Sequence, residues 1–252
     1  ISCVPLEVAS WFARSLHQNF GTGAVVAAGE TEKPLLGNAF SGIKGVFTSP
    51  YLLGIAGFIA LMTFASTILY FAQSDLVYSA MTDRGERTAF LAKIDLTVNI
   101  LTIVFEVYLT ARLIRWLGVG LTLAVIPAAV AVGFLALGVY PTLATLVVVQ
   151  IIYRAGRYGM TKPAREILFT VVSREEKYKS KAFIDAAVYR GGDLGSGWIY
   201  AGLAFVGLSL GTIAMLAAPV AAMWAILGIR VAAKGDVKAA EMESEKVTMP
   251  VA

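Results

Sequence analysis

Six ionisable residues lie within, or at the edges of, the apolar stretches of this chain, and they are its main candidates for chemistry. They are Glu106, Arg154, Arg157, Asp185, Arg190 and Asp193. Charged groups are costly in a bilayer, so they usually face a protein interior or a water-filled path and mark function. Arginines that face a cavity would suit an anionic ligand, because guanidinium groups pair bidentately with carboxylate or phosphate. The alternative is structural: ion pairs, or side chains that snorkel to an interface.

These residues recur at helical spacing, which gathers them on helix faces. One predicted helix carries polar residues at steps of three and four, namely Asp95, Asn99, Thr102, Glu106 and Thr110. Such steps place side chains on one face, although Thr residues there could simply hydrogen-bond to neighbouring helices. Arg154 and Arg157 share a face with Gln150. Arg190 and Asp193 are three residues apart, a spacing at which side chains meet, so we predict an ion pair between them.

The composition places these helices in a membrane. Hydrophobic residues make up 58% of the chain and charged residues 15%, and the mean hydropathy is +0.73. A soluble domain would carry more charge, about a quarter of its residues. One Cys and one His exclude an internal disulfide and a histidine-rich metal site. We expect no cofactor, no nucleic-acid partner and no enzyme, because neither a nucleotide-binding motif nor a nucleophile–base pair is visible.

Long charge-free runs separated by short charged ones predict an all-α polytopic membrane protein with six spanning helices. The predicted spans are Pro50–Gln73, Asp95–Trp116, Val119–Val139, Pro141–Gly159, Ala182–Leu208 and Gly211–Ile229. The connections Gly138–Pro141 and Leu208–Gly211 are very short, so the third and fourth spans and the fifth and sixth form hairpins.

The chain divides into four parts around this bundle, which occupies residues 50–230. Residues 1–14 resemble the tail of a preceding helix cut by a truncated gene model, since an apolar run of about 12 residues is too short to span a bilayer. Residues 15–49 read as a cytoplasmic linker rich in Gly, Ala and Thr. Residues 231–252 are polar, and we expect a disordered cytoplasmic tail there.

The distribution of Lys and Arg predicts the orientation. The linker, the second/third and fourth/fifth connections and the tail hold most of the basic residues, whereas the opposite side has only Arg84, Arg87 and Lys93. Cytoplasmic loops carry the excess of positive charge, so both ends of the chain should be cytoplasmic in an inner or plasma membrane. Lys177, Lys179 and Lys181 would anchor that face and attract anionic lipids.

Glycines crowd the start of the fifth predicted span, beside the charges. Gly191 and Gly195 form a small-xxx-small pair, which allows another helix to approach closely. The same glycines could instead break the helix and expose its backbone to a substrate.

The block from Lys162 to Asp193 resembles the C-terminal half of the ATP/ADP antiporter (nucleotide translocase) family of plastids and intracellular bacteria, and its bacterial relatives of unassigned substrate. The similarity rests on Arg165-Glu166, Lys177 to Lys181, the Lys181-Ala182-x-Ile184-Asp185 run, and Arg190 followed by a glycine-rich turn. The six-span layout extends the likeness to most of the chain.

This resemblance implies a twelve-helix, major-facilitator-like fold, of which the chain would be the second half. A missing N-terminal half, or a second copy, would then complete the bundle. Nucleotide exchangers place a lysine in the glycine-rich turn shortly after the matching arginine, and this chain has Asp193 there. Asp193 therefore argues against inferring ATP/ADP exchange from this resemblance.

We therefore expect a secondary transporter that works by alternating access on an anionic or nucleotide-like solute. Proton coupling through Glu106 or Asp193 is an open alternative, although no histidine relay accompanies either residue. The competing hypothesis is a non-transporting scaffold or accessory module whose charges neutralise one another in a closed, dry bundle. A cavity that reaches Arg190 and Glu106 from one side would distinguish the two.

Overall fold

The structure, a computed structural model, describes residues 45–248. The predicted helix tail at 1–14 and most of the linker lie outside the described residues. Within residues 45–248 the chain is helical and forms no strand. The prediction of an all-α protein is thus confirmed for this part of the chain.

From Pro50 to Thr248 the chain forms eight α-helices, joined partly by π-helical or 3-10 turns, and residues 45–48 before them are also helical. The α-helices are α3 (Pro50–Ala80), α4 (Arg84–Val104), α5 (Thr110–Val139), α6 (Leu143–Gly156), α7 (Lys162–Leu168), α8 (Arg174–Phe183), α9 (Tyr189–Phe205) and α10 (Leu210–Thr248). The π-helical turns are η2 (Phe105–Leu109), η3 (Arg157–Thr161) and η5 (Ile184–Val188), and the 3-10 turn is η4 (Phe169–Val171).

Local chemistry explains where several of these helices begin and bend. The side chain of Ser49 caps α3 by accepting a hydrogen bond from the Leu52 amide, with Pro50 in the first turn. Asp83 caps α4 in the same way through the Glu86 amide. Helix α5 breaks at Gly118, whose φ of 75° is accessible mainly to glycine. This break falls between the second and third predicted spans.

Three helical segments are long and apolar enough to cross a membrane, namely Pro50–Ala80, Arg84–Val139 and Leu210–Glu241. They support the assignment to the membrane class. The helical runs that contain α6 and α9 are not among them. These two runs carry Arg154, Arg157, Arg190 and Asp193, whose charge lowers their hydropathy.

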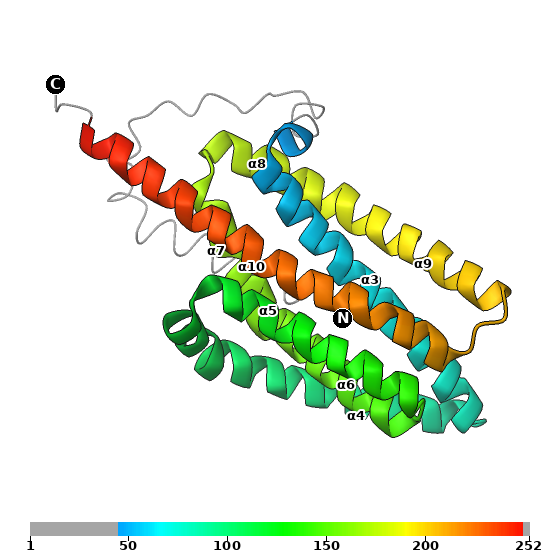
Figure 1. The fold of residues 1–252 in the computed structure, drawn as a ribbon. Helices are drawn as coiled ribbons and strands as arrows, with labels where there is room; N and C mark the ends of the chain where they lie inside the picture. Colours follow the sequence, from blue (N-terminus) through cyan, green and yellow to red (C-terminus); the bar gives the residue numbers. More distant parts are fainter. Residues whose placement is uncertain (1–44, 249–252) are drawn as a thin grey trace, which may run out of the picture. The chain divides into compact units, whose positions relative to one another are not determined.

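Helix α3 lies at the centre of the packing and contacts α6, α9 and α10 (Figure 1). Helix α10 runs along both α3 and α5 and approaches α5 very closely at its start. A Cβ on Gly211 would lie 2.9 Å from the carbonyl oxygen of Gly138, so only glycine allows this approach. The core between the helices is apolar, and Trp224 packs on Phe58 with ring centroids 5.5 Å apart.

Helix α10 continues to Thr248, so the prediction of a disordered tail from residue 231 is wrong for residues 231–248. The tail is polar, but its start packs against the bundle: Val231 contacts Gly54, and Ala232 contacts Gly120. Ala, Lys and Glu, which dominate the segment, are also strong helix formers. Polarity alone therefore misjudged a segment that has both packing partners and helix propensity.

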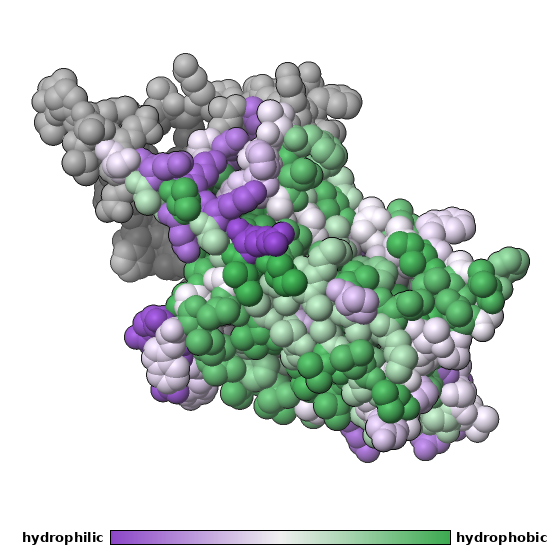
Figure 2. All heavy atoms as spheres, in the orientation of Figure 1, coloured by the Kyte–Doolittle hydropathy of each residue, from purple (hydrophilic) through white to green (hydrophobic). Residues whose placement is uncertain are grey.

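The view in Figure 2 shows apolar side chains over the middle of the bundle, with polar ones gathered toward the end where α7 and α8 lie. This pattern fits a bundle that meets lipid along its flanks and water at its ends.

Candidate functional site

The site centres on Arg157, the first residue of the π-helical turn η3. Its guanidinium donates hydrogen bonds to the hydroxyls of Ser66 and Tyr153, both at 3.3 Å, and to the hydroxyl of Tyr189. The guanidinium also lies 5.3 Å from the ring centroids of Tyr158 and Tyr189. These partners come from α3, α6, η3 and α9, so one side chain joins four elements. π-Helical turns are rare and frequently occur at functional sites.

Arg157 has aromatic and hydroxyl partners but no carboxylate partner. No Asp or Glu oxygen among the described residues lies within 4 Å of its guanidinium. Tyr153 is buried and donates its own hydroxyl hydrogen to the Met62 carbonyl oxygen at 3.0 Å, which fixes the ring against α3. The charge of Arg157 is therefore held in place by tyrosines but is not neutralised by them.

A cavity of about 410 Å³ opens beside Arg157, and we call it the basic cavity. It is lined by Met62, Arg157, Tyr158, Thr161, Lys162, Arg165, Asp185, Tyr189 and Arg190. Four of these side chains are cationic and only Asp185 is anionic. Arg165 lies 3.6 Å from Asp185, so that carboxylate is already paired. The cavity thus holds an excess of positive charge that an anionic ligand would balance.

Two lining atoms of the basic cavity have no hydrogen-bond partner although they are buried. They are Oγ1 of Thr161, a residue that is only 1% exposed, and Nε of Arg165. Buried polar atoms are almost always paired, so unpaired ones call for an explanation such as a bound water or ligand. Both atoms can donate to an anion.

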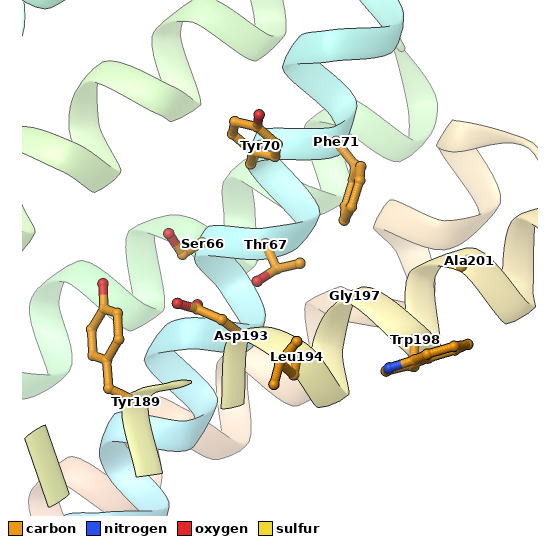
Figure 3. A pocket seen from close by; sticks show the side chains of 10 residues that line it. All are labelled: Ser66, Thr67, Tyr70, Phe71, Tyr189, Asp193, Leu194, Gly197, Trp198 and Ala201. Atoms are coloured by element: carbon orange, nitrogen blue, oxygen red, sulfur yellow. The ribbon is translucent and has the colours of Figure 1, made fainter. Parts of the chain in front are cut away.

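A second cavity of about 640 Å³ lies on the other side of Tyr189, between α3 and α9 (Figure 3). We call it the aromatic cavity. It is lined by Ser66, Thr67, Tyr70, Phe71, Tyr189, Asp193, Leu194, Gly197, Trp198 and Ala201. Tyr189 lines both cavities.

Arg190 and Asp193 do not form the predicted ion pair, since no oxygen of Asp193 lies within 4 Å of Arg190. Arg190 lines the basic cavity, whereas Asp193 lines the aromatic cavity and points toward α3, where Ser66 and Thr67 lie (Figure 3). Spacing by three residues brings side chains to neighbouring positions, but here the two side chains line different cavities and form no ion pair.

The other predicted site residues are distributed around this centre. Arg154 forms a 2.6 Å ion pair with Asp95, which joins α6 to α4 and neutralises both charges. Glu106 is exposed in η2 and lines neither cavity. The structure therefore groups Arg157, Asp185 and Arg190 around one cavity, places Asp193 next to it, and leaves Arg154 and Glu106 apart.

Asp185 also belongs to a charged cluster at the end of the bundle where α7 meets α8. Lys181 donates a 2.6 Å hydrogen bond to Glu166, which also lies 3.7 Å from Arg165. Partial burial raises the pKa of the Glu166 carboxyl, but the hydrogen bond and charge of Lys181, helped by Arg165 and Lys177, bring that pKa below its ordinary value of 4.5.

The glycines of α9 pack differently from the prediction. A Cβ on Gly191 or Gly195 would have no atom within 4 Å, so the small-xxx-small pair faces open space. Gly192 is the close-packed one, and a Cβ there would collide with Thr63 of α3. Helix α9 also continues unbroken through these residues, so the alternative of a local helix break is wrong.

The tyrosines that hold Arg157 were not predicted from the sequence. Tyr153 lies four residues before Arg157, a spacing that puts both on one helix face and could have suggested the contact. Tyr189 gave no such signal, because it reaches Arg157 from a distant helix. Asp75 was also missed; it accepts a 2.5 Å hydrogen bond from the hydroxyl of Tyr200 and joins α3 to α9.

Comparison of the chain with family models, with curated proteins and with solved structures finds no match. The helical fold and the candidate spans define a membrane protein of the all-α class. Any finer assignment depends on the site.

Proposed function

We propose that the chain is the C-terminal, six-helix half of a major-facilitator-like secondary transporter, which moves an anionic solute by alternating access. The observation that carries the proposal is Arg157: a cation held by tyrosines, without a carboxylate partner among the described residues, on the wall of a cavity rich in positive charge. Such an arrangement leaves one charge for a ligand to balance.

The helical runs support a six-helix bundle. With the break at Gly118, the described helices group into the runs 50–80, 84–117, 119–139, 143–168, 174–205 and 210–248. Each run overlaps one predicted span, although most runs extend beyond the predicted bounds. Helices α6 and α9 carry charged side chains, so exposing those side chains to lipid would be unfavourable. A cavity inside a larger bundle would keep the charges away from the lipid.

Helices α4 and α9 are only sparsely covered by the rest of the described chain. Helix α4 has only Ile94 and Val98 buried, and it contacts little beyond α6 and the π-helical turns. Helix α9 packs chiefly on α3 and exposes Trp198 and Phe205. In a two-half transporter these helices would meet the partner half, and the resemblance to nucleotide translocases points the same way.

The binding step follows from the geometry. An anion that enters the basic cavity can accept hydrogen bonds from Arg157 and Arg190 and from the unpaired Thr161 hydroxyl. Binding energy realised in only one of two bundle states shifts the equilibrium toward that state, which is what alternating access requires. The tyrosines around Arg157 hold its charge in position between cycles.

A closed scaffold remains the competing candidate, and the 2.6 Å Arg154–Asp95 pair is the observation that favours it. If all embedded charges were neutralised in this way, no transport path would be needed. Arg157 and Arg190 do not follow that pattern, because each lines a cavity and has no ion-pair partner within 4 Å among residues 45–248.

Uptake into proteoliposomes tests the proposal. The complete natural polypeptide is reconstituted and assayed with radiolabelled inorganic phosphate, succinate and ATP, against Arg157→Gln and the exposed control Arg112→Gln. We expect saturable uptake of at least one anion by the wild type and the control, and its loss in Arg157→Gln. Absence of uptake of all three anions, or full uptake by Arg157→Gln, would refute the proposal.

A further inference from the structure

We propose that Asp193 is the coupling site for a proton, so that one proton enters with each anion. This inference rests on the proposed transport function and adds its driving force. The geometry that carries it is a half-buried carboxyl inside the aromatic cavity that has no ion-pair or hydrogen-bond partner among the described residues.

The surroundings of Asp193 favour a proton over a salt bridge. Tyr70, Phe71 and Trp198 supply much of the cavity wall (Figure 3). An isolated carboxylate in such surroundings is costly, whereas a protonated carboxyl carries no charge. Ser66 and Thr67 of α3 lie on the side toward which Asp193 points, and their hydroxyls can accept its proton in a hydrogen bond or donate to the carboxylate.

The charged and titratable groups near Asp193 leave the carboxyl without a dedicated cation. Helix α3 contributes Tyr70, and α9 itself contributes Tyr189 and Arg190. The turn η3 contributes Arg157, which is bound by hydroxyls, and η5 contributes Asp185, which pairs with Arg165. The part of α10 that faces α9 is apolar, with Ile213, Leu216, Ala217 and Val220.

A metal ion is the less suitable occupant of this position. Among the described residues no group of three His, Cys, Asp or Glu side chains could hold one. The other residues that line the aromatic cavity are hydroxyl-bearing, aromatic or aliphatic, and none of them offers a second carboxylate. A proton needs only the carboxyl itself.

Ser66 connects this carboxyl to the anion site. Its hydroxyl accepts a 3.3 Å hydrogen bond from Arg157 and lies on the α3 face toward which Asp193 points. An ionised Asp193 would repel an anion in the basic cavity, and it would partly offset the positive charge of Arg157 and Arg190. A protonated Asp193 would leave both arginines to the anion. At the short range between the cavities this difference changes anion affinity by about 10- to 100-fold.

Linkage makes the effect reciprocal. If protonation strengthens anion binding, then a bound anion strengthens proton binding by the same factor. The two ligands therefore load together and leave together, which is the requirement for symport. A proton gradient directed inward would then drive the anion inward.

Infrared spectroscopy tests whether Asp193 holds the proton, independently of transport. The complete polypeptide in liposomes is titrated with acid, and the carbonyl stretch of protonated carboxyls is compared between wild type, Asp193→Asn and Glu106→Gln. All carboxyls contribute on acidification, so the readout is the difference between the wild-type and variant spectra. We expect the wild type minus Asp193→Asn difference to contain a titrating band that Glu106→Gln retains. A difference spectrum without such a band overturns the assignment.

Proton flux tests the coupling. A pH-sensitive dye inside the liposomes reports acidification when phosphate, succinate or ATP is added outside. We expect acidification with the transported anion in wild type, and in Asp193→Asn anion exchange without acidification. Anion uptake by the wild type without acidification refutes the coupling of proton to anion but is consistent with the proposed transport function. If none of the anions crosses, the transport function fails and coupling fails with it, while the infrared band still decides whether Asp193 binds the proton.

Discussion

Replacing Arg157 with Gln should weaken anion binding strongly, while the same change at Arg154 should not. Arg157 lines the basic cavity and has no carboxylate partner within the described residues, whereas Arg154 is paired with Asp95 and lines neither cavity. The two arginines are three residues apart on one helical run, so they form a matched pair of variants. Both changes remove one positive charge from the same run.

The size of the effect follows from what the guanidinium can offer an anion. A hydrogen bond to a charged group contributes about 1.5–3 kcal/mol. A fully formed charge pair at about 4 Å would contribute about 4 kcal/mol at an effective dielectric constant near 20. The anion must displace some of the bonds that Arg157 makes to Ser66, Tyr153 and Tyr189. The smaller range is therefore appropriate, and it corresponds to about 10- to 150-fold weaker binding.

Binding of the transported anion is measured by scintillation proximity on detergent-purified protein, with a thermal melt of each variant as the folding control. Arg157→Lys keeps the charge but loses the planar fork, so it should fall between wild type and Arg157→Gln. Arg154→Gln should lower the melting temperature slightly, because an exposed ion pair contributes about 0.2–1 kcal/mol, and should leave the affinity unchanged. Equal loss of affinity in Arg154→Gln and Arg157→Gln, or none in Arg157→Gln, would refute the reasoning about the site.

Two further predictions concern stability. Because the folded pKa of Glu166 lies below its ordinary value of 4.5, the Lys181–Glu166 pair stabilises the fold above that pH, and the benefit is lost as the pH falls through the folded pKa. On acidification below pH 4.5 the melting temperature should fall less in Glu166→Gln than in wild type. If the melting temperatures of the two proteins fall in parallel, the pairing is contradicted. Gly192→Ala should destabilise the fold by about 1–3 kcal/mol through its collision with Thr63. Gly195 faces open space, so Gly195→Ala should be neutral or stabilising by up to about 1 kcal/mol, because Ala favours helix. Denaturant titration measures the free energy of unfolding of both variants. Equal effects of Gly192→Ala and Gly195→Ala would refute the packing of α9.

Much of the fold could be predicted because its signals are local. Apolar runs and their breakers gave the helices, and the boundary expected near Val119 falls at Gly118, where the backbone conformation requires glycine. Helix ends were less predictable: α3 continues past Gln73 to Ala80, since nothing after Gln73 interrupts a helix. The extension of α10 depends on the contact of Val231 with Gly54, which no local pattern reveals.

The sequence indicated which types of residue form the candidate site, but it did not indicate how they are arranged in space. Embedded charge drew attention to Arg157 and Arg190, and both of these residues line the basic cavity. Helical spacing alone wrongly paired Arg190 with Asp193, because the two side chains line different cavities. Those cavities are built by residues that are far apart in sequence. Such contacts become visible only in three dimensions.

Cysteine accessibility at Tyr158 tests alternating access most directly. Tyr158 lines the basic cavity and is 46% exposed. The 252 residues contain one cysteine, Cys3, so Tyr158→Cys is made in a background in which Cys3, and every cysteine in the rest of the polypeptide used, is replaced by Ser. A membrane-impermeant thiol reagent is applied separately to each side of oriented vesicles, with and without the transported anion. Leu135→Cys, on an exposed apolar face of α5, is the control that lipid should protect.

We expect Tyr158→Cys to react from one side without the anion, and we expect saturating anion to shift the reactivity toward the other side. Leu135→Cys should react from neither side under any condition. A Tyr158→Cys thiol that reacts from neither side would contradict the account and favour the closed scaffold. Reactivity from one side that the anion leaves unchanged would contradict alternating access.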